Sequence, residues 1–283
     1  MMPTIADIIK TGEDLLAEAG ISDARRDAFA LVCLAIGRDR SFIYSHPDYQ
    51  PTSEETAGIE QNIRRRANRE PLQYIRGSQE FYGFEFEVTP DVLIPRPETE
   101  MIVERAIQIL KGSNDPRFLD LGTGSGCIPI SILGNVPNAR GVAVDISPDA
   151  LAVAARNAER HGVAERLELV ESNLFEKLPP TKYDLIVSNP PYVPEQDLDH
   201  LQPEVRDHEP HVALSDGRDG VSIIERILKD SRHYLDPGGV LIIEIGFGQS
   251  ERVLEVAVGS GWVSAEIEAD LRGIPRMLAA KSS

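Results

Sequence analysis

The segment Asn189-Pro190-Pro191-Tyr192 holds the residues of this sequence whose types and spacing best suit chemistry. It directly follows the apolar, strand-like run from Tyr183 to Ser188. Proline has no N–H to donate and restricts the residue before it, so the two prolines should end the strand and stiffen the backbone. The Asn189 side-chain oxygen and the Pro190 carbonyl then form two adjacent acceptors for the two N–H groups of an uncharged amide or amine. Tyr192 adds an aromatic face that can favour a cationic ligand.

The same four residues are also typical of a strand that ends in an ordinary proline turn. This motif alone leaves both interpretations open, because so short a pattern needs structural context. The sequence upstream favours the functional one.

A Gly-rich turn, Gly122-Thr123-Gly124-Ser125-Gly126, follows the short apolar segment 118–121 and precedes the apolar segment 127–133. Glycines there permit a tight turn and a close approach of the backbone to a ligand at a helix N-terminus. Asp145 ends the next predicted strand and lies about 20 residues beyond the turn, the spacing expected of a carboxylate that binds ribose hydroxyls. Asp145 can also be a helix-start residue before Ser147 and Pro148.

Strand and helix patterns alternate through the C-terminal two thirds of the chain. The predicted strands are 141–144, 167–170, 184–188 and 240–245, and the predicted helices are 148–161, 220–234 and 249–259. Such alternation predicts an α/β fold with a mostly parallel sheet covered by helices on both faces. Gly122, Asp145, Asn173 and Asn189 each follow a strand, so we expect them on one rim of the sheet, where ligands bind in such folds.

The chain before residue 77 contains only helix patterns. Thr4, Ser22 and Thr52 are expected to start three helices, and Thr52 with Glu55 has the spacing of a capping box. From residue 80 to 93 the apolar period changes to two, which predicts a β-hairpin. We therefore expect a helical bundle over residues 1–76, a hairpin linker over 77–97 and a catalytic domain over 98–283.

Two clusters of charged or titratable residues have alternative interpretations. The arginines 64, 65, 66 and 69 are either a solvated helix face or a docking patch for an acidic or RNA-bound partner. His200, His208 and His211 lie close together in the sequence. A metal site is not expected there, because Pro210 prevents the helical spacing that such sites need and no cysteine is near.

Composition limits the classes of function. The 283 residues carry a formal charge of −17, and so acidic a surface repels the phosphates of an extended nucleic acid. Cys33 and Cys127 are the only cysteines and occur in apolar surroundings, which indicates buried thiols and no disulfide framework. We found neither a signal peptide pattern nor an apolar run of about 18 residues, so we expect a soluble, cytoplasmic protein without membrane contact.

The sequence resembles the class I methyltransferases that use S-adenosylmethionine, and specifically the HemK/PrmC family, the N5-glutamine methyltransferases of peptide release factors. Three blocks carry the resemblance, namely Val92-Leu93-Ile94-Pro95-Arg96-Pro97-Glu98-Thr99-Glu100, Asp120-Leu121-Gly122-Thr123-Gly124-Ser125-Gly126 and Ser188-Asn189-Pro190-Pro191-Tyr192-Val193-Pro194. The N-terminal helical segment also matches the family in order and size. The resemblance implies a Rossmann-like methyltransferase domain preceded by a bundle that helps to dock the release factor.

The resemblance also implies roles for individual residues. The cofactor, S-adenosyl-L-methionine, would be bound by Gly122, Thr123, Gly124, Ser125, Gly126, Asp145, Asn173, Leu174 and Asn189. The catalytic residues would be Asn189, Pro190 and Tyr192, and the substrate would contact these three with Pro191, Arg96 and Glu98. The acceptor would be the glutamine of the Gly-Gly-Gln motif in class 1 release factors. Asn173 stands where the family usually has Asp, and the segment from Asp270 to Met277, with Arg272 and Arg276, also departs from the family pattern.

Two other functions are compatible with parts of this pattern. An adenine-N6 methyltransferase of DNA or RNA would use the same Asn-Pro-Pro-Tyr motif, because an exocyclic amine presents the same two donors. It would also have to flip a base and hold a phosphate backbone, which the acidic composition disfavours. A nucleotide-binding oxidoreductase would share the Gly-rich turn but gives the residues from Asn189 to Tyr192 no role.

Overall fold

The computed structural model describes residues 3–283 and consists of two compact units. The first unit runs to Gly77 and also contains Gln202–His208. The second contains Ser78–Leu201 and Glu209–Ser283. The boundaries expected from the sequence, at residues 76 and 97, did not anticipate that a segment beyond residue 200 groups with the helical unit.

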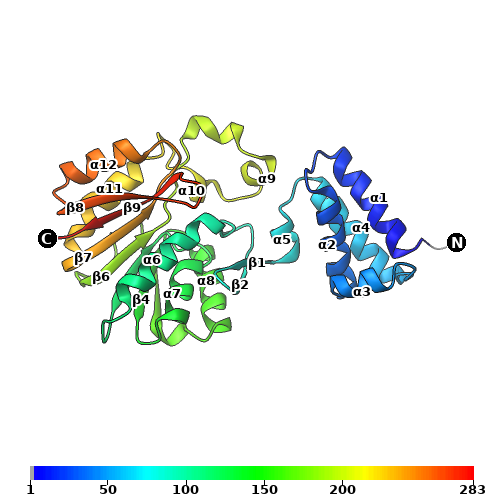
Figure 1. Cartoon of the computed structure of the whole chain (residues 1–283), viewed down its shortest axis with the longest axis horizontal. Coiled ribbons are helices and arrows are strands. Elements are labelled where there is room, and N and C mark those ends of the chain that lie inside the picture. The colour runs from blue at the N-terminus through cyan, green and yellow to red at the C-terminus, as the bar shows by residue number, and fades with distance from the viewer. Residues whose placement is uncertain (1–2) are drawn as a thin grey trace. The chain divides into compact units, whose positions relative to one another are not determined.

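The first unit is helical (Figure 1). Its helices are α1 (Ile5–Glu18), α2 (Ala24–Ile36), α3 (Arg40–Ser45), α4 (Ser53–Ala67), α5 (Leu72–Arg76) and α9 (Pro203–Arg206). Thr4 and Thr52 cap α1 and α4 as predicted, each in a capping box with the acidic residue three positions later. The second helix starts after Asp23, so the expectation of a Ser22 cap was wrong. The short helices α3 and α5 were not predicted.

The arginine run is largely engaged inside the first unit. Arg66 is buried, and its guanidinium donates to Asp27 at 2.8 Å and to Glu204 at 3.0 Å. Arg69 donates to the other Glu204 oxygen at 2.7 Å, and Arg65 pairs with Glu70. Only Arg64 of the four is highly exposed. Most of the run therefore stabilises the unit, a role that neither sequence-based interpretation had assigned to it.

A seven-stranded sheet forms the centre of the second unit. A separate antiparallel hairpin, β1 (Ser78–Phe81) and β2 (Phe84–Glu87), precedes it. The sheet strands are β3 (Arg117–Leu121), β4 (Arg140–Asp145), β5 (Leu167–Glu171), β6 (Tyr183–Ser188), β7 (Leu235–Glu244), β8 (Ser264–Ala269) and β9 (Pro275–Lys281). Their order is β5-β4-β3-β6-β7-β9-β8, with the first five parallel and β9 antiparallel to both neighbours. The chain adds β4 and β5 on one side of β3 and then crosses over to add β6 and β7 on the other side. Ligands bind at such a switch point, here between β3 and β6, in open α/β sheets.

Helices cover both faces of this sheet (Figure 1). The helices of the second unit are α6 (Glu100–Leu110), α7 (Cys127–Asn135), α8 (Pro148–Arg160), α10 (His211–Leu214), α11 (Ser222–Asp230) and α12 (Ser250–Gly259), with 3₁₀ turns at Pro97–Thr99, Ala164–Arg166, Glu195–His200 and Ser231–His233. Along β6, Leu185 and Val187 pack with α6 and α7, while Ile186 packs with α11 and α12. The alternating side chains of one buried strand thus serve two cores. The predicted α/β fold is confirmed.

The antiparallel strands β8 and β9 at the sheet edge were not predicted. The segment that departs from the family pattern forms the turn between them and the start of β9, where Arg276 donates to Asp270 at 3.4 Å. Cys127 is buried and burial raises the pKa of its thiol to about 12, whereas Cys33 is only half-buried.

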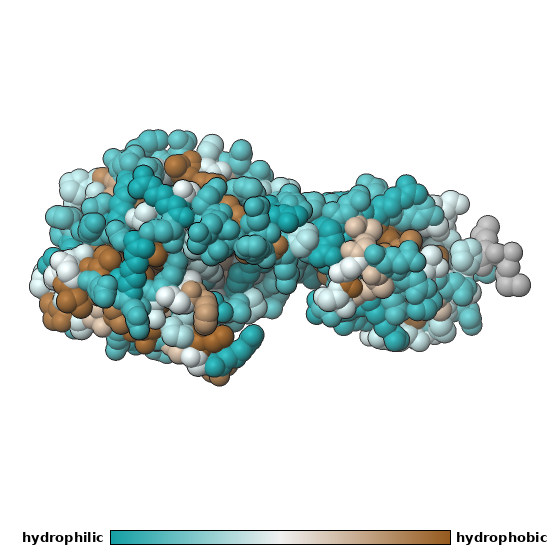
Figure 2. Space-filling model, turned by 90° about the horizontal axis from the view of Figure 1, so that it is seen from above, coloured by the Kyte–Doolittle hydropathy of each residue, from teal (hydrophilic) through white to brown (hydrophobic). Residues whose placement is uncertain are grey.

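Figure 2 shows hydrophilic residues over most of the visible surface of each unit. Among the described residues, no helix has the length and apolarity needed to cross a membrane.

Candidate functional site

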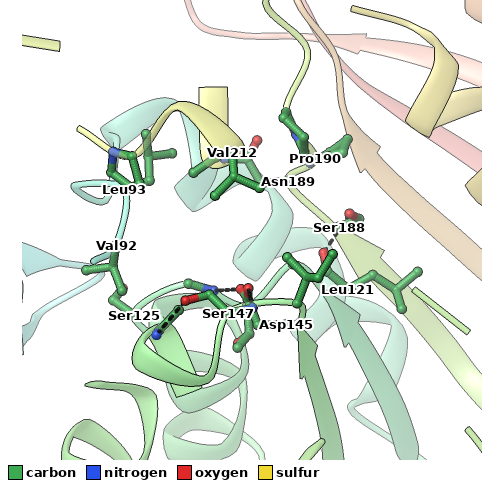
Figure 3. Close-up of a pocket in the computed structure, with 18 of the residues that line it drawn as sticks. Val92, Leu93, Leu121, Ser125, Asp145, Ser147, Ser188, Asn189, Pro190 and Val212 are labelled. Atoms are coloured by element: carbon green, nitrogen blue, oxygen red, sulfur yellow. Dashed lines mark hydrogen bonds between the residues drawn. The ribbon is translucent and has the colours of Figure 1, made fainter. Parts of the chain in front are cut away.

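One pocket of the second unit opens beyond the carboxyl ends of β3, β4, β5 and β6 (Figure 3). It is lined by Gly122, Thr123, Gly124, Ser125, Asp145, Asn173, Leu174, Asn189, Pro190, Pro191 and Arg96, all predicted site residues. Gly126, Glu98 and Tyr192, which were also predicted, do not line it. Figure 3 shows Asp145 and Ser147 on one side of the pocket and Asn189 and Pro190 on the opposite side.

The Gly-rich turn is held against Asp145. One carboxylate oxygen of Asp145 accepts a hydrogen bond from the Gly124 N–H at 2.8 Å, and the other accepts one from the Ser147 N–H at 3.0 Å. Each oxygen retains a lone pair for a ligand hydroxyl. Gly126 has φ of +79°, and a Cβ at this position would lie 2.9 Å from the Ile130 Cδ1 atom, so only glycine fits here without a shift of its neighbours.

Within the described chain, no well-formed hydrogen bond reaches the buried carboxyl oxygens of Asp120 or the buried hydroxyl oxygens of Thr123 and Ser125. The Thr123 hydroxyl still lies near enough to Asp120, and the Ser125 hydroxyl near enough to Cys127, to lower the pKa of those two groups. Burial raises the pKa of Asp120 to about 7, and the nearby Asp145 carboxylate adds to this shift. Buried polar groups without partners are rare in folded proteins, and Thr123 and Ser125 line the pocket, so their hydroxyls mark a place where a polar ligand fits. S-adenosylmethionine, with its ammonium, carboxylate and ribose hydroxyl groups, offers suitable partners.

The Asn189 corner leaves two acceptors free. Ser188 fixes the end of β6 by donating its hydroxyl to the Leu121 carbonyl at 2.7 Å. The Asn189 side-chain nitrogen donates to the Thr99 hydroxyl at 3.1 Å. Neither the Asn189 Oδ1 nor the Pro190 carbonyl accepts a hydrogen bond from any residue in the range 3–283. The arrangement can therefore bind a group that brings two N–H donors.

Tyr192 does not line the pocket. Its hydroxyl donates to Glu244 at 3.1 Å, and burial raises the pKa of the phenol. The Gln249 amide holds the loop by donating to the Tyr192 carbonyl at 2.9 Å and to the Gly220 carbonyl at 3.2 Å. Gly220 has φ of +78°, and a Cβ at that position would lie 2.2 Å from the Tyr192 carbonyl oxygen. Only glycine permits this close approach of the two loops.

The loop after β5 places a strained residue at the pocket. Leu174 has φ of +53°, a conformation that non-glycine residues rarely adopt and that is enriched at functional sites. The side chain of the neighbouring Asn173 is already engaged, because its oxygen accepts from Arg226 at 3.1 Å and its nitrogen donates to Glu176 at 2.9 Å. Asn173 thus lines the pocket while its amide group is held by two other side chains.

Arg96 does not present a free guanidinium to the pocket. It forms an ion pair with the buried Glu209, whose other oxygen accepts from the Ile94 N–H at 3.1 Å. Glu209 thereby joins the segment around Arg96 to α10 and its N-cap Pro210, which supply Pro210, Val212 and Ala213 to the pocket wall.

Thr99 and Glu244 were not among the predicted site residues. Thr99 precedes α6 and Glu244 ends β7, yet their side chains meet at 2.7 Å, and both are buried. Burial raises the pKa of Glu244. The sequence did contain a signal for Glu244, because an acidic residue at the end of an apolar strand is unusual and indicates a buried partner or ligand. Asp120 in β3 is a second example.

No group of three or more His, Cys, Asp or Glu side chains in the described chain is arranged to hold a metal ion. His208 has a ring nitrogen 3.3 Å from the Asn68 carbonyl oxygen.

Comparisons with known proteins agree with the motifs. Residues 7–77 match the PrmC N-terminal domain, and residues 102–204 match the methyltransferase small domain. A release factor glutamine methyltransferase from Geobacter sulfurreducens is 45% identical over 97% of this chain and 95% of that protein. One from Cereibacter sphaeroides is 42% identical over 98% of each chain.

Among solved structures, a methyltransferase from Pyrococcus furiosus superposes with a TM-score of 0.55 at 18% identity, covering 72% of this chain and 91% of that one. At this identity the likeness concerns the fold alone. The full-length relatives go further, since their similarity spans nearly the whole chain, including both matched domains. The chain belongs to the release factor glutamine methyltransferase family, whose methyl donor is S-adenosylmethionine.

Proposed function

We propose that this enzyme methylates the side-chain nitrogen of the glutamine in the Gly-Gly-Gln motif of class 1 peptide chain release factors. The observation that carries the proposal is the pair of free acceptors at the pocket, Asn189 Oδ1 and the Pro190 carbonyl. A primary amide has two N–H donors on one nitrogen, which this pair matches. The names of full-length relatives supply the protein substrate.

We assign donor binding to the opposite side of the pocket. Asp145 would accept from the ribose hydroxyls, and the unpartnered groups at the Gly-rich turn would meet the methionine end of the donor. The backbone at Leu174 and Asn173 would border the adenine, because the Asn173 amide is engaged with Arg226 and Glu176. Bound S-adenosylmethionine supplies a methyl group on a positively charged sulfur, an electrophile that a neutral nitrogen can attack.

The acceptor nitrogen needs help, because its lone pair is delocalised into the amide carbonyl. Asn189 and Pro190 would orient it through both N–H groups and stabilise the positive charge that grows on it during transfer. The nitrogen loses a proton after it has become cationic, so no strong base is needed beforehand. In this mechanism Asn189 and Pro190 are the catalytic groups.

We further propose that the helical unit helps to dock the release factor and that the reaction takes place in the cytoplasm, where translation terminates. The engaged state of Arg65, Arg66 and Arg69 makes Arg64 the one arginine of the run available for such docking.

The test is a transfer assay with labelled S-adenosylmethionine and three acceptors: a purified class 1 release factor, the same factor with its Gly-Gly-Gln glutamine changed to alanine, and adenine-containing RNA and DNA. We expect label only on the unaltered factor. Label on nucleic acid would instead support an adenine-N6 methyltransferase, and label on the altered factor would place the acceptor elsewhere.

A further inference from the structure

Glu244 and Thr99 form a buried hydrogen-bonded chain that ends at Asn189. The Thr99 hydroxyl donates to Glu244 Oε2 at 2.7 Å, and the Asn189 Nδ2 donates to the Thr99 hydroxyl oxygen at 3.1 Å. Three separate elements contribute to this chain: the end of β7, the turn before α6 and the loop after β6. Glu244 is 3% exposed and Thr99 is 2% exposed, so water does not compete for these bonds.

The donors and acceptors of this hydrogen-bonded chain are arranged in one direction. In the structure the Thr99 hydroxyl gives its single proton to Glu244 Oε2, and the Tyr192 hydroxyl gives its own to Oε1, so both carboxyl oxygens of Glu244 act as acceptors. The Thr99 oxygen is then an acceptor toward Asn189, and an amide meets an acceptor with its NH₂ group. Oδ1 of Asn189 consequently faces the other way and is left free for a ligand.

Amide orientation decides whether the site functions. In the opposite orientation, Asn189 would present NH₂ to the incoming NH₂ of the acceptor, and two donors would face each other. Nothing else in residues 3–283 fixes the orientation, since the Nδ2 to Thr99 bond is the one side-chain hydrogen bond of Asn189.

We propose that Thr99 and Glu244 are positioning residues that set the orientation of the Asn189 amide and thereby select an acceptor with two N–H donors. This inference rests on the proposed function, because it assigns the free oxygen to the acceptor glutamine. Neither residue touches the reacting atoms in this scheme. Glu244 also accepts from the Tyr192 hydroxyl at 3.1 Å, which helps to keep the carboxylate in place.

The decisive variants are Thr99→Val, Thr99→Ser and Glu244→Gln. Valine preserves the shape of threonine and removes the hydroxyl, whereas serine keeps the hydroxyl. Glutamine can donate to Thr99 and so reverse the direction of the chain. Ser231→Ala is a matched control, because Ser231 is a fully buried hydroxyl that donates to the Ile227 carbonyl at 2.6 Å outside the pocket lining.

Single-turnover methyl transfer to the release factor is measured at saturating donor and acceptor, with donor affinity by calorimetry and thermal unfolding measured in parallel. We expect Thr99→Val and Glu244→Gln to lower the maximal rate about tenfold or more, the loss expected when one hydrogen bond no longer sets the orientation. Donor affinity should stay within about twofold. Thr99→Ser should recover most of the rate, and Ser231→Ala should transfer methyl at the parent rate despite its lost hydrogen bond.

A second readout follows the amide itself. In ¹⁵N NMR, the side-chain NH₂ signal of Asn189, assigned through Asn189→Ala, should exchange slowly with water in the parent and in Thr99→Ser, and faster in Thr99→Val. Parent rates and unchanged exchange in folded Thr99→Val would overturn the inference. If the parent itself transferred no methyl to the release factor, the proposed function would fail instead, so the two failures are distinguishable.

Discussion

The Asp120 carboxyl should make the unfolding free energy of the ligand-free enzyme depend on pH, and Asp120→Asn should remove this contribution. Its carboxyl is fully buried in β3, where the nearby Thr123 hydroxyl offsets only part of the effect of burial on its pKa. Burial raises its pKa from 3.8 to about 7. The folded chain therefore binds this proton more tightly than the unfolded chain does.

The direction of this pH dependence follows because folding and proton binding by Asp120 are thermodynamically linked. Between about pH 4 and pH 7 the unfolded chain has released the Asp120 proton while the folded chain still holds it, so stability falls as pH rises through this window. Each unit of pKa difference corresponds to about 1.4 kcal/mol. The shift from 3.8 to about 7 thus corresponds to roughly 4 kcal/mol of stability that is lost between these two pH values.

The assay compares Asp120→Asn with the parent by urea unfolding at several pH values. Contributions of groups that do not interact with Asp120 cancel in the difference between the two proteins. We expect this difference to be small near pH 4 and to grow to a few kcal/mol in favour of Asp120→Asn at pH 8. A flat difference for Asp120→Asn would refute the assignment of a raised pKa to this carboxyl.

Three further predictions concern other parts of the molecule. Asp145→Ala should weaken S-adenosylmethionine binding by about 1.5 to 3 kcal/mol, the worth of hydrogen bonds to a charged group, and unchanged affinity by calorimetry would argue against its ribose role. Glu204→Ala should lower the unfolding free energy of the helical unit by about 3 kcal/mol, because it removes a partner of the buried Arg66; urea unfolding that matches the parent would contradict this. Gly220→Ala should lower both the melting temperature and the transfer rate, since its Cβ would overlap the Tyr192 carbonyl, and a variant with parent values of both would show that the two loops can separate freely.

Local patterns predicted the parts of the site that the backbone alone creates. The missing N–H groups of Pro190 and Pro191 and the glycines of the turn after β3 act within a few residues, so their effect is visible in the sequence. The parallel order of the strands then brings these loops together at one rim. The antiparallel pair β8 and β9 was missed although segment 264–269 alternates apolar and polar residues, the pattern of a half-exposed strand.

Contacts between residues far apart in the sequence could not be predicted from such local patterns. Thr99 and Glu244 are 145 positions apart, and Arg66 reaches Glu204 over 138 positions. Which polar residues meet depends on the packing of complete elements, and a single sequence does not reveal that packing. What the sequence does reveal is an acidic residue in an apolar strand, as at Asp120 and Glu244, which indicates that a partner or a ligand must be found.

The most direct test of the central claim is the single-turnover rate of Asn189→Ala at saturating S-adenosylmethionine and saturating release factor. The side-chain oxygen of Asn189 is assigned to the acceptor nitrogen as positive charge grows on it, so its loss should lower the rate about 10²-fold or more while the protein remains folded. Methyl transfer by Asn189→Ala at near the parent rate would contradict the assignment of Asn189 and Pro190 as the acceptor site.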